Sequence, residues 1–160
     1  MDDREKKLTL IVFSNDFDRA TAAFIIATGA ASSGMQVNMF FTFWGLSLLR
    51  LKSRSARSKT LVERMFGWML PKGPDEASLS KMNFLGLGTS MMKGVMRKKR
   101  IPGLPDLMDT AVSLGVKLIA CTTSMGIMGI GKDELREGLE YGGVATYLNE
   151  ARGAGVNLFI

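Results

Sequence analysis

The alternation of short apolar runs with helical patterns constrains the fold of this chain more than any other feature, and it is clearest near the N-terminus. Residues 7–13, KLTLIVF, are β-branched and apolar, as expected for a central strand. Residues 17–33 place alanines and apolar side chains at helical spacing and are followed by Gly34, which suits the left-handed position after a helix. Residues 35–43 end apolar on both faces, as a parallel strand covered by helices should. These runs predict a strand–helix–strand unit with parallel strands.

The same alternation continues in the C-terminal part of the chain. Two helices (residues 106–114 and 144–152) and two strands (116–120 and 156–160) are expected, with a further short strand near residue 140. Such an order is typical of a parallel sheet with helices on both faces. At 160 residues and 46% hydrophobic, the chain can form one domain with a sizeable core. We therefore expect residues 1–160 to form a single α/β domain, a doubly wound parallel sheet of about five strands flanked by helices.

The pattern changes over residues 44–104. Residues 50–100 hold 13 of the 21 basic residues and three acidic ones, a net charge of +10, whereas the rest of the chain carries −4. Pro71 and Pro74 interrupt this segment, and residues 80–100 form a Met- and Gly-rich amphipathic stretch that ends in four consecutive basic residues. We predict a basic, Met-rich helical insertion with a mobile middle.

The insertion has three possible roles. It can be a solvated charged face, a nucleic-acid-binding surface, or a contact surface for a membrane or a protein partner. Binding to nucleic acid favours aromatic residues interleaved with the charges, but Phe66, Trp68 and Phe84 are sparse and alternate with Met and Leu. The apolar run at residues 40–51 is too short to span a bilayer. We favour a protein contact or peripheral membrane contact through residues 44–100 over nucleic acid.

The cysteine and histidine counts exclude several kinds of chemistry. With no histidine and one cysteine, the chain cannot form a zinc site of the usual Cys/His type, a Ser-His-Asp triad, a Cys-His pair or an intramolecular disulfide. No metal or cofactor is expected. The N-terminal residues are charged and lead directly into a strand, unlike a secretory signal, so we expect a cytoplasmic protein. The insertion suggests that this protein can also associate with a membrane.

Cys121 is the candidate reactive group. The strand at residues 116–120 leads to it, and Thr122, Thr123 and Ser124 follow in a sequence suited to beginning a helix. Ligands of open α/β sheets collect where strands end and helices begin, and the N–H groups of a helix start favour a thiolate. The alternative is that Cys121 is a small buried hydrophobic residue and that the three hydroxyl residues are ordinary helix caps.

The glycines after Cys121 have the spacing of a phosphate-binding loop, since four residues separate Gly126 from Gly131-Lys132. Asp133 follows where a hydroxyl should hold magnesium, and a carboxylate there would repel phosphates. We therefore interpret the glycines as sites of tight packing and turns near the thiol. Thr122, Thr123, Ser124 and Gly126 are taken as candidate substrate contacts.

Several segments together resemble the DsrE/DsrF/DsrH-like proteins of sulfur relay, in particular their larger stand-alone branch. These are the opening strand KLTLIVFSND, the second strand ending in MFFTFWGL, the basic Met-rich insertion, and ACTTSMGIMG with Cys121 at its strand end. The resemblance implies a homo-oligomer of parallel α/β subunits. It also implies that Cys121 accepts sulfane sulfur as a persulfide and passes it to the thiol of a sulfur-carrier or other partner protein.

We therefore expect a sulfurtransferase or sulfur-carrier protein in which Cys121 is catalytic, accessible and partly ionised by helix N–H groups and nearby lysine or arginine. The alternative function is a non-enzymatic scaffold that binds a membrane or a partner and in which Cys121 only packs.

Overall fold

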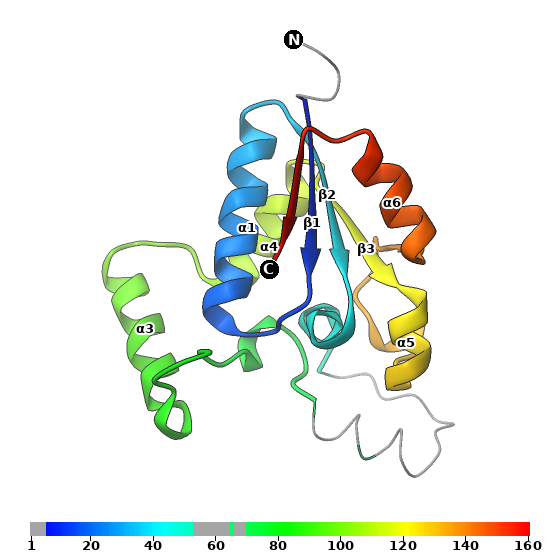
Figure 1. Ribbon diagram of the computed structural model, residues 1–160. Coiled ribbons are helices and arrows are strands. Elements are labelled where there is room, and N and C mark those ends of the chain that lie inside the picture. The colour runs from blue at the N-terminus through cyan, green and yellow to red at the C-terminus, as the bar shows by residue number, and fades with distance from the viewer. Residues whose placement is uncertain (1–5, 53–64, 66–69) are drawn as a thin grey trace.

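The computed structural model describes residues 6–52, 65 and 70–160, and its centre is a five-stranded sheet (Figure 1). The strands are β1 (Lys7–Val12), β2 (Gln36–Phe41), β3 (Lys117–Cys121), β4 (Glu140–Gly142) and β5 (Val156–Phe159). They lie in the order β4-β3-β2-β1-β5, and every neighbouring pair is parallel. This confirms the predicted doubly wound parallel sheet, including the short strand near residue 140.

The N-terminal unit forms as its sequence predicts. Helix α1 (Phe17–Ser32) buries Ala20, Phe24 and Ala27 completely, because residues three and four positions apart lie on one helix face. After the helix, Gly34 adopts a φ of 84°, a backbone conformation that glycine reaches without strain. The chain then enters β2, which pairs with β1 along its whole length.

Helices cover the two faces of the sheet unequally. Helices α1 and α4 (Leu104–Ser113) pack against each other on one face, while α6 (Val144–Arg152) lies on the other (Figure 1). Helix α4 begins two residues before the sequence predicted, because Pro105 fits the first turn, where no backbone N–H is needed. No α6 side chain is fully buried, so this helix packs lightly.

The described parts of the insertion contain helical elements, as expected, but its first part belongs to the core. The 3₁₀ helix η2 (Phe43–Leu49) buries Leu46, Leu48 and Leu49 almost completely. Two short 3₁₀ turns, η3 (Pro74–Glu76) and η4 (Phe84–Gly86), then lead to α3 (Leu87–Lys98), which stands to the side of the sheet (Figure 1). The predicted mobile middle of the insertion, with Phe66 and Trp68, lies outside the described residues. In the described ranges, no helix combines the length and hydropathy needed to cross a bilayer.

A buried ion pair anchors the segment that follows η2. Arg50 and Glu134 are both almost wholly buried, with 2.9 Å between Nη2 and Oε2. The Leu51 amide also donates to the Glu134 carbonyl, and Glu134 lies in the 3₁₀ turn η5 (Lys132–Glu134). These bonds join the chain beyond the end of β2 to the chain beyond the end of β3, so both segments are fixed at the carboxyl edge of the sheet.

Candidate functional site

Cys121 is the last residue of β3, at the carboxyl edge of the sheet, where the sequence placed it. Successive side chains of a strand point to opposite faces, so Ile119 and Cys121 share one face of β3. They form a small apolar cluster with Phe40 of β2, and Tyr147 of α6 packs against it. The thiol therefore lies on the sheet face covered by α6, separate from the main core against α1 and α4.

The helix after β3 begins immediately beyond the thiol. Helix α5 spans Thr122–Met128, which makes Cys121 the residue before its first turn. The Ser124 hydroxyl donates a hydrogen bond to Cys121 Sγ, with 3.4 Å between the two atoms. Thr42, directly after β2, lies with its hydroxyl oxygen 2.7 Å from Ser124 Oγ. A chain of two hydroxyl groups thus leads from the end of β2 to the sulfur.

These groups determine the ionisation of the thiol. Burial raises the pKa of Cys121, but hydrogen bonds to its sulfur from the Ser124 hydroxyl and amide act in the opposite direction. The Thr42 hydroxyl and the Thr123 amide add to this effect, and the pKa lies below the ordinary value of a cysteine. Lysine and arginine, which we expected to help, are not among these groups in the described part of the chain. The thiolate is favoured by hydroxyl and amide dipoles.

The thiol is less accessible than the sequence analysis expected. Cys121 is only 5% exposed, because it is enclosed by the apolar cluster on the α6 face. The rings of Phe40 and Tyr147 lie 5.3 Å apart within this cover. The expectation of an open thiol is therefore wrong for this conformation, although polar hydroxyl groups line one side of the sulfur.

The other candidate residues separate into two groups. Ser124 is 2% exposed and contacts the sulfur, whereas Thr122, Thr123 and Gly126 are exposed. Of these three, Thr123 reaches the thiol through its amide. Gly126 lies within α5 and not in a turn, and a Cβ there would meet nothing within 4 Å, so the interpretation of Gly126 as a site of tight packing or a turn is wrong.

Two residues near the thiol were missed by the sequence analysis. Thr42 is the first residue after β2, and parallel neighbouring strands bring their carboxyl ends together, so the edge that holds Cys121 also holds Thr42. The position of Thr42 at the end of a predicted strand was therefore a signal that the sequence already contained. Tyr147 gave no such signal, because its contact with the cluster depends on how α6 lies against the sheet.

The glycine-rich run does not form a phosphate-binding loop. Its first part is the helix α5, which ends at Gly129 with a φ of 63°. Lys132 lies over the ring of Tyr141, with 4.5 Å from Nζ to the ring centroid. In the part of the chain that the structure describes, no group of three or more Cys, Asp or Glu residues is arranged to hold a metal ion.

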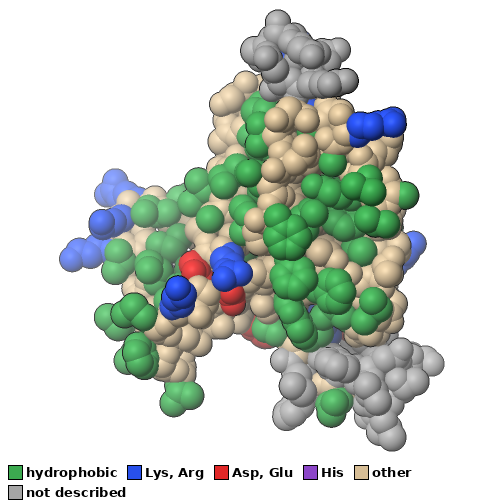
Figure 2. Space-filling model, viewed as in Figure 1, with side chains coloured by type: hydrophobic (Ala, Val, Ile, Leu, Met, Phe, Trp, Pro, Cys, Tyr) green, Lys and Arg blue, Asp and Glu red, His purple; other side chains and the backbone are tan. Residues whose placement is uncertain are grey.

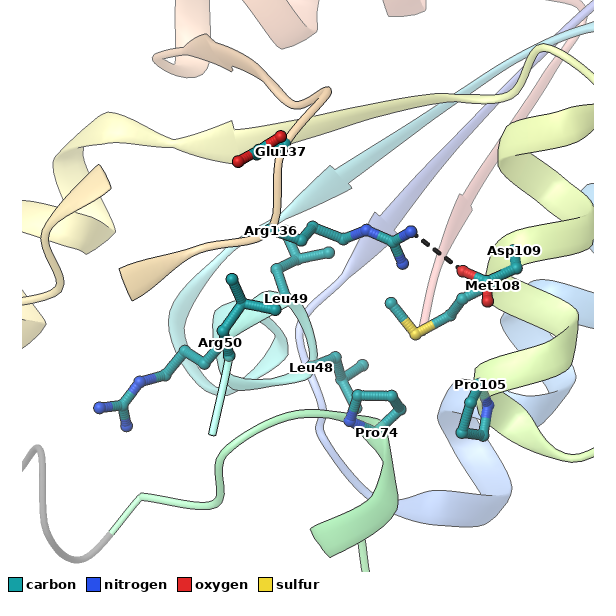
Figure 3. A pocket seen from close by; sticks show the side chains of 10 residues that line it. Leu48, Leu49, Arg50, Pro74, Pro105, Met108, Asp109, Arg136 and Glu137 are labelled. Carbon is teal, nitrogen blue, oxygen red and sulfur yellow. Dashed lines mark hydrogen bonds and ion pairs between the residues drawn. The ribbon is translucent and has the colours of Figure 1, made fainter. Parts of the chain in front are cut away.

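A cavity of about 470 Å³ lies apart from the thiol, between α4 and the chain that follows η2. Figure 3 shows the ion pair between Arg136 and Asp109, 3.0 Å long, across one side of this cavity, while the Arg50 guanidinium points away from it. Cys121 lines neither this cavity nor a second one of about 330 Å³ beside α3. The thiol site is therefore not part of either cavity.

The fold and the site define a class of protein: a parallel α/β domain with one hydrogen-bonded cysteine at the carboxyl edge of its sheet. Comparison with known proteins gives the family. The sequence model of the DsrE/DsrF/DrsH-like family matches residues 4–159, and the chain belongs to this family. The resemblance inferred from the sequence is confirmed.

Two relatives match over nearly their full length. The chain is 46% identical, over all of both sequences, to the uncharacterized protein YrkE of Bacillus subtilis. It is 32% identical to the sulfur carrier protein DsrE2 of Allochromatium vinosum, over 98% of this chain and 99% of the relative.

Two solved structures share the fold at low sequence identity. The crystal structure of the ychN protein from E. coli has a TM-score of 0.56 and 10% identity, over 97% of this chain and 99% of that one. The protein of unknown function MTH1491 from Methanobacterium thermoautotrophicum has a TM-score of 0.53 and 13% identity, over 96% and 99%. These likenesses support the α/β fold.

Proposed function

We propose that this protein is a sulfur carrier in which Cys121 accepts sulfane sulfur as a persulfide and passes it to a partner thiol. Membership of the family and the 32% identity to a sulfur carrier protein support a role in sulfur relay. The observation that carries the assignment to Cys121 is the lowered pKa of the only cysteine, held by hydroxyl and amide donors at the sheet edge. A thiolate is the form that reacts in sulfur exchange.

The proposed reaction needs no oxidant. The Cys121 thiolate attacks the outer sulfur of a donor persulfide, a sulfur–sulfur bond forms, and the donor leaves as a thiolate. In the second half, the thiolate of an acceptor attacks the outer sulfur held on Cys121, and Cys121 leaves as a thiolate. One sulfur–sulfur bond breaks and one forms in each step. The outer sulfur and its proton move together.

The groups around the sulfur act in both halves of this exchange. The Ser124 hydroxyl and the Thr123 and Ser124 amides stabilise negative charge on Sγ when it attacks and again when it leaves. Because the chain has no second cysteine, it cannot resolve the persulfide internally. The subunit must hand the sulfur to another protein, so we expect a carrier with little turnover of its own.

Access to the sulfur requires movement of its cover. Tyr147 packs against the cluster that contains Cys121, and its helix, α6, buries no side chain fully. A lightly packed helix is displaced at lower cost than one fixed in a core. We propose that the donor and the acceptor reach Cys121 when Tyr147 moves away from it.

We also propose that the subunits associate through the sheet face that α6 leaves partly open. Figure 2 shows hydrophobic side chains gathered over this side of the molecule, and Phe159, Val144 and Leu148 are each more than half exposed. The Phe13 ring joins them, 5.8 Å from the Phe159 ring. Contiguous apolar surface of this kind marks interaction sites. A second copy there would lie on the same face as Cys121, and sedimentation analysis of Phe159→Ser tests this arrangement.

The sulfur-carrier proposal is tested by weighing the intact protein after incubation with thiosulfate, polysulfide or a persulfidated carrier. We expect an addition of about 32 Da, removed by reductant and absent from Cys121→Ser. The alternative is a scaffold in which Cys121 only packs, which the 5% exposure of this residue favours. It predicts no reversible addition with any of these donors, and that result would remove the sulfur-carrier proposal.

A further inference from the structure

Helix α3 turns its more apolar side away from the protein. Thr89 and Met96 are buried, and Lys93 between them lies over the Phe17 ring, with 5.2 Å from Nζ to the ring centroid. Lys93 also donates to the backbone carbonyl of Asp75. The inner side of the helix is therefore held to the body by one threonine, one methionine and one lysine.

The outer face of α3 carries Leu87, Met91 and Val95, which are spaced by four residues and so lie in one row. Each of them is at least half exposed. Just before the helix, Phe84 is largely exposed and Leu85 is fully exposed. A helix whose outward row is apolar is unusual for a surface that faces only water.

The segment that carries this face has charge of one sign. Residues 77–105 contain six lysines and arginines and no aspartate or glutamate. Four of the basic residues, at positions 97–100, form a basic run at the C-terminal end of α3, and all four are exposed. Among the described residues, none of these four forms an ion pair. Figure 2 shows basic side chains at one end of this part of the molecule and hydrophobic side chains along it.

We propose that the outer face of α3, with Phe84, Leu85 and the basic run, docks on the surface of an anionic phospholipid bilayer. An amphipathic helix lies in the plane of the interface, with its apolar row among the acyl chains and its cations against the headgroups. The twelve residues of α3 extend for about 18 Å, enough to lie along the interface and too short to cross it.

Charge and apolar surface together favour the bilayer over two other occupants. A second copy of the chain docked through the same face would bring two segments together that each carry six cations and no anion. Nucleic acid would satisfy the cations but leave the Leu and Met row in water. An anionic bilayer matches the cations and the apolar row together.

The first experiment measures co-sedimentation of the purified full chain with vesicles of phosphatidylcholine, with and without phosphatidylglycerol. We expect binding to the anionic vesicles only, weakening as salt increases. The double substitution Lys98→Gln with Lys99→Gln should lower the partition coefficient at least about tenfold. Leu85→Ser with Leu87→Ser should lower it by at least a similar factor, because two apolar side chains no longer enter the interface.

A matched control separates the basic run from net charge. Lys117→Gln with Arg152→Gln removes the same formal charge from exposed positions outside the insertion. This variant should bind anionic vesicles as the unmodified protein does. An equal loss of binding in the control would overturn the assignment to α3, since any cation would then serve.

A second experiment tests insertion directly. In a Cys121→Ser background, Leu85→Cys provides a single site for an environment-sensitive fluorophore, and Val112→Cys on α4 provides an exposed control site. We expect a blue shift with anionic vesicles at position 85 and none at 112. Because this chain lacks Cys121, the result does not depend on the sulfur-carrier proposal.

Three outcomes contradict the membrane proposal. The first is absence of binding to anionic vesicles. The second is unchanged fluorescence at position 85 in their presence. The third is that the substitutions at Leu85 and Lys98 change the oligomeric state or salt-sensitive DNA binding but leave vesicle binding unchanged.

Discussion

Removing the Ser124 hydroxyl should make the Cys121 thiolate less stable. A hydrogen bond to a charged acceptor contributes roughly 1.5–3 kcal/mol, and sulfur is a weak acceptor, which places this bond at the lower end. The oxygen–sulfur separation of 3.4 Å agrees with a bond of that strength. A loss of about 1.4 kcal/mol corresponds to a tenfold change in an equilibrium constant. We therefore expect Ser124→Ala to lower the thiolate-to-thiol ratio about tenfold at a given pH below the titration midpoint, and so to raise the Cys121 pKa.

The direct measurement is a pH titration followed by the ultraviolet absorbance of the thiolate, with Cys121→Ser subtracted as the blank. Alkylation rates report the change less well, because the nucleophilicity of a thiolate rises with its pKa and would reduce the effect to about threefold. Thr122→Ala is the matched control, since Thr122 is exposed and forms no hydrogen bond to the sulfur in the described structure. Coincident titrations of Ser124→Ala and the unmodified protein, or an equal shift in Thr122→Ala, would refute the proposed stabilisation.

Two further substitutions test the packing around the site. Gly45→Ala should lower the free energy of unfolding by about 3 kcal/mol or more, because the new Cβ would lie 2.1 Å from the Val12 carbonyl oxygen. Thermal melts measure this loss, and Gly126→Ala is the control that should not show it, because the space around Gly126 is open. Tyr147→Ala should make alkylation of Cys121 severalfold faster by removing its cover, whereas an unchanged rate would contradict the proposed route of access.

The sequence predicted the sheet well because each strand and helix has its own local signal. The β-branched run at residues 7–13, the alanine-rich helix after it and Gly34 all specify the same unit, and β1, α1 and β2 form there. The insertion was harder to delimit. Residues 43–49 follow a strand without a turn signal, and only the tertiary structure shows that their leucines complete the core.

Only those features of the site that depend on local sequence pattern were predicted. The position of Cys121 at a strand end depends on local pattern, and the structure agrees with it. Its exposure depends on Tyr147 and Phe40, which come from other elements of the fold. The lowered pKa of Cys121 comes mainly from Ser124, three residues along the chain, and Thr42, 79 positions earlier, adds to it because the parallel pairing of β2 and β3 brings it near.

The most direct test of the account follows the sulfur from Cys121 to another protein. The persulfidated chain, freed of donor, is mixed with a reduced acceptor protein that carries one reactive thiol, and both are weighed intact over time. We expect this chain to lose about 32 Da while the acceptor gains the same mass. A stable addition on Cys121 that no acceptor thiol removes, or an acceptor that gains sulfur equally well from the mock-treated Cys121→Ser protein, would contradict the proposed relay.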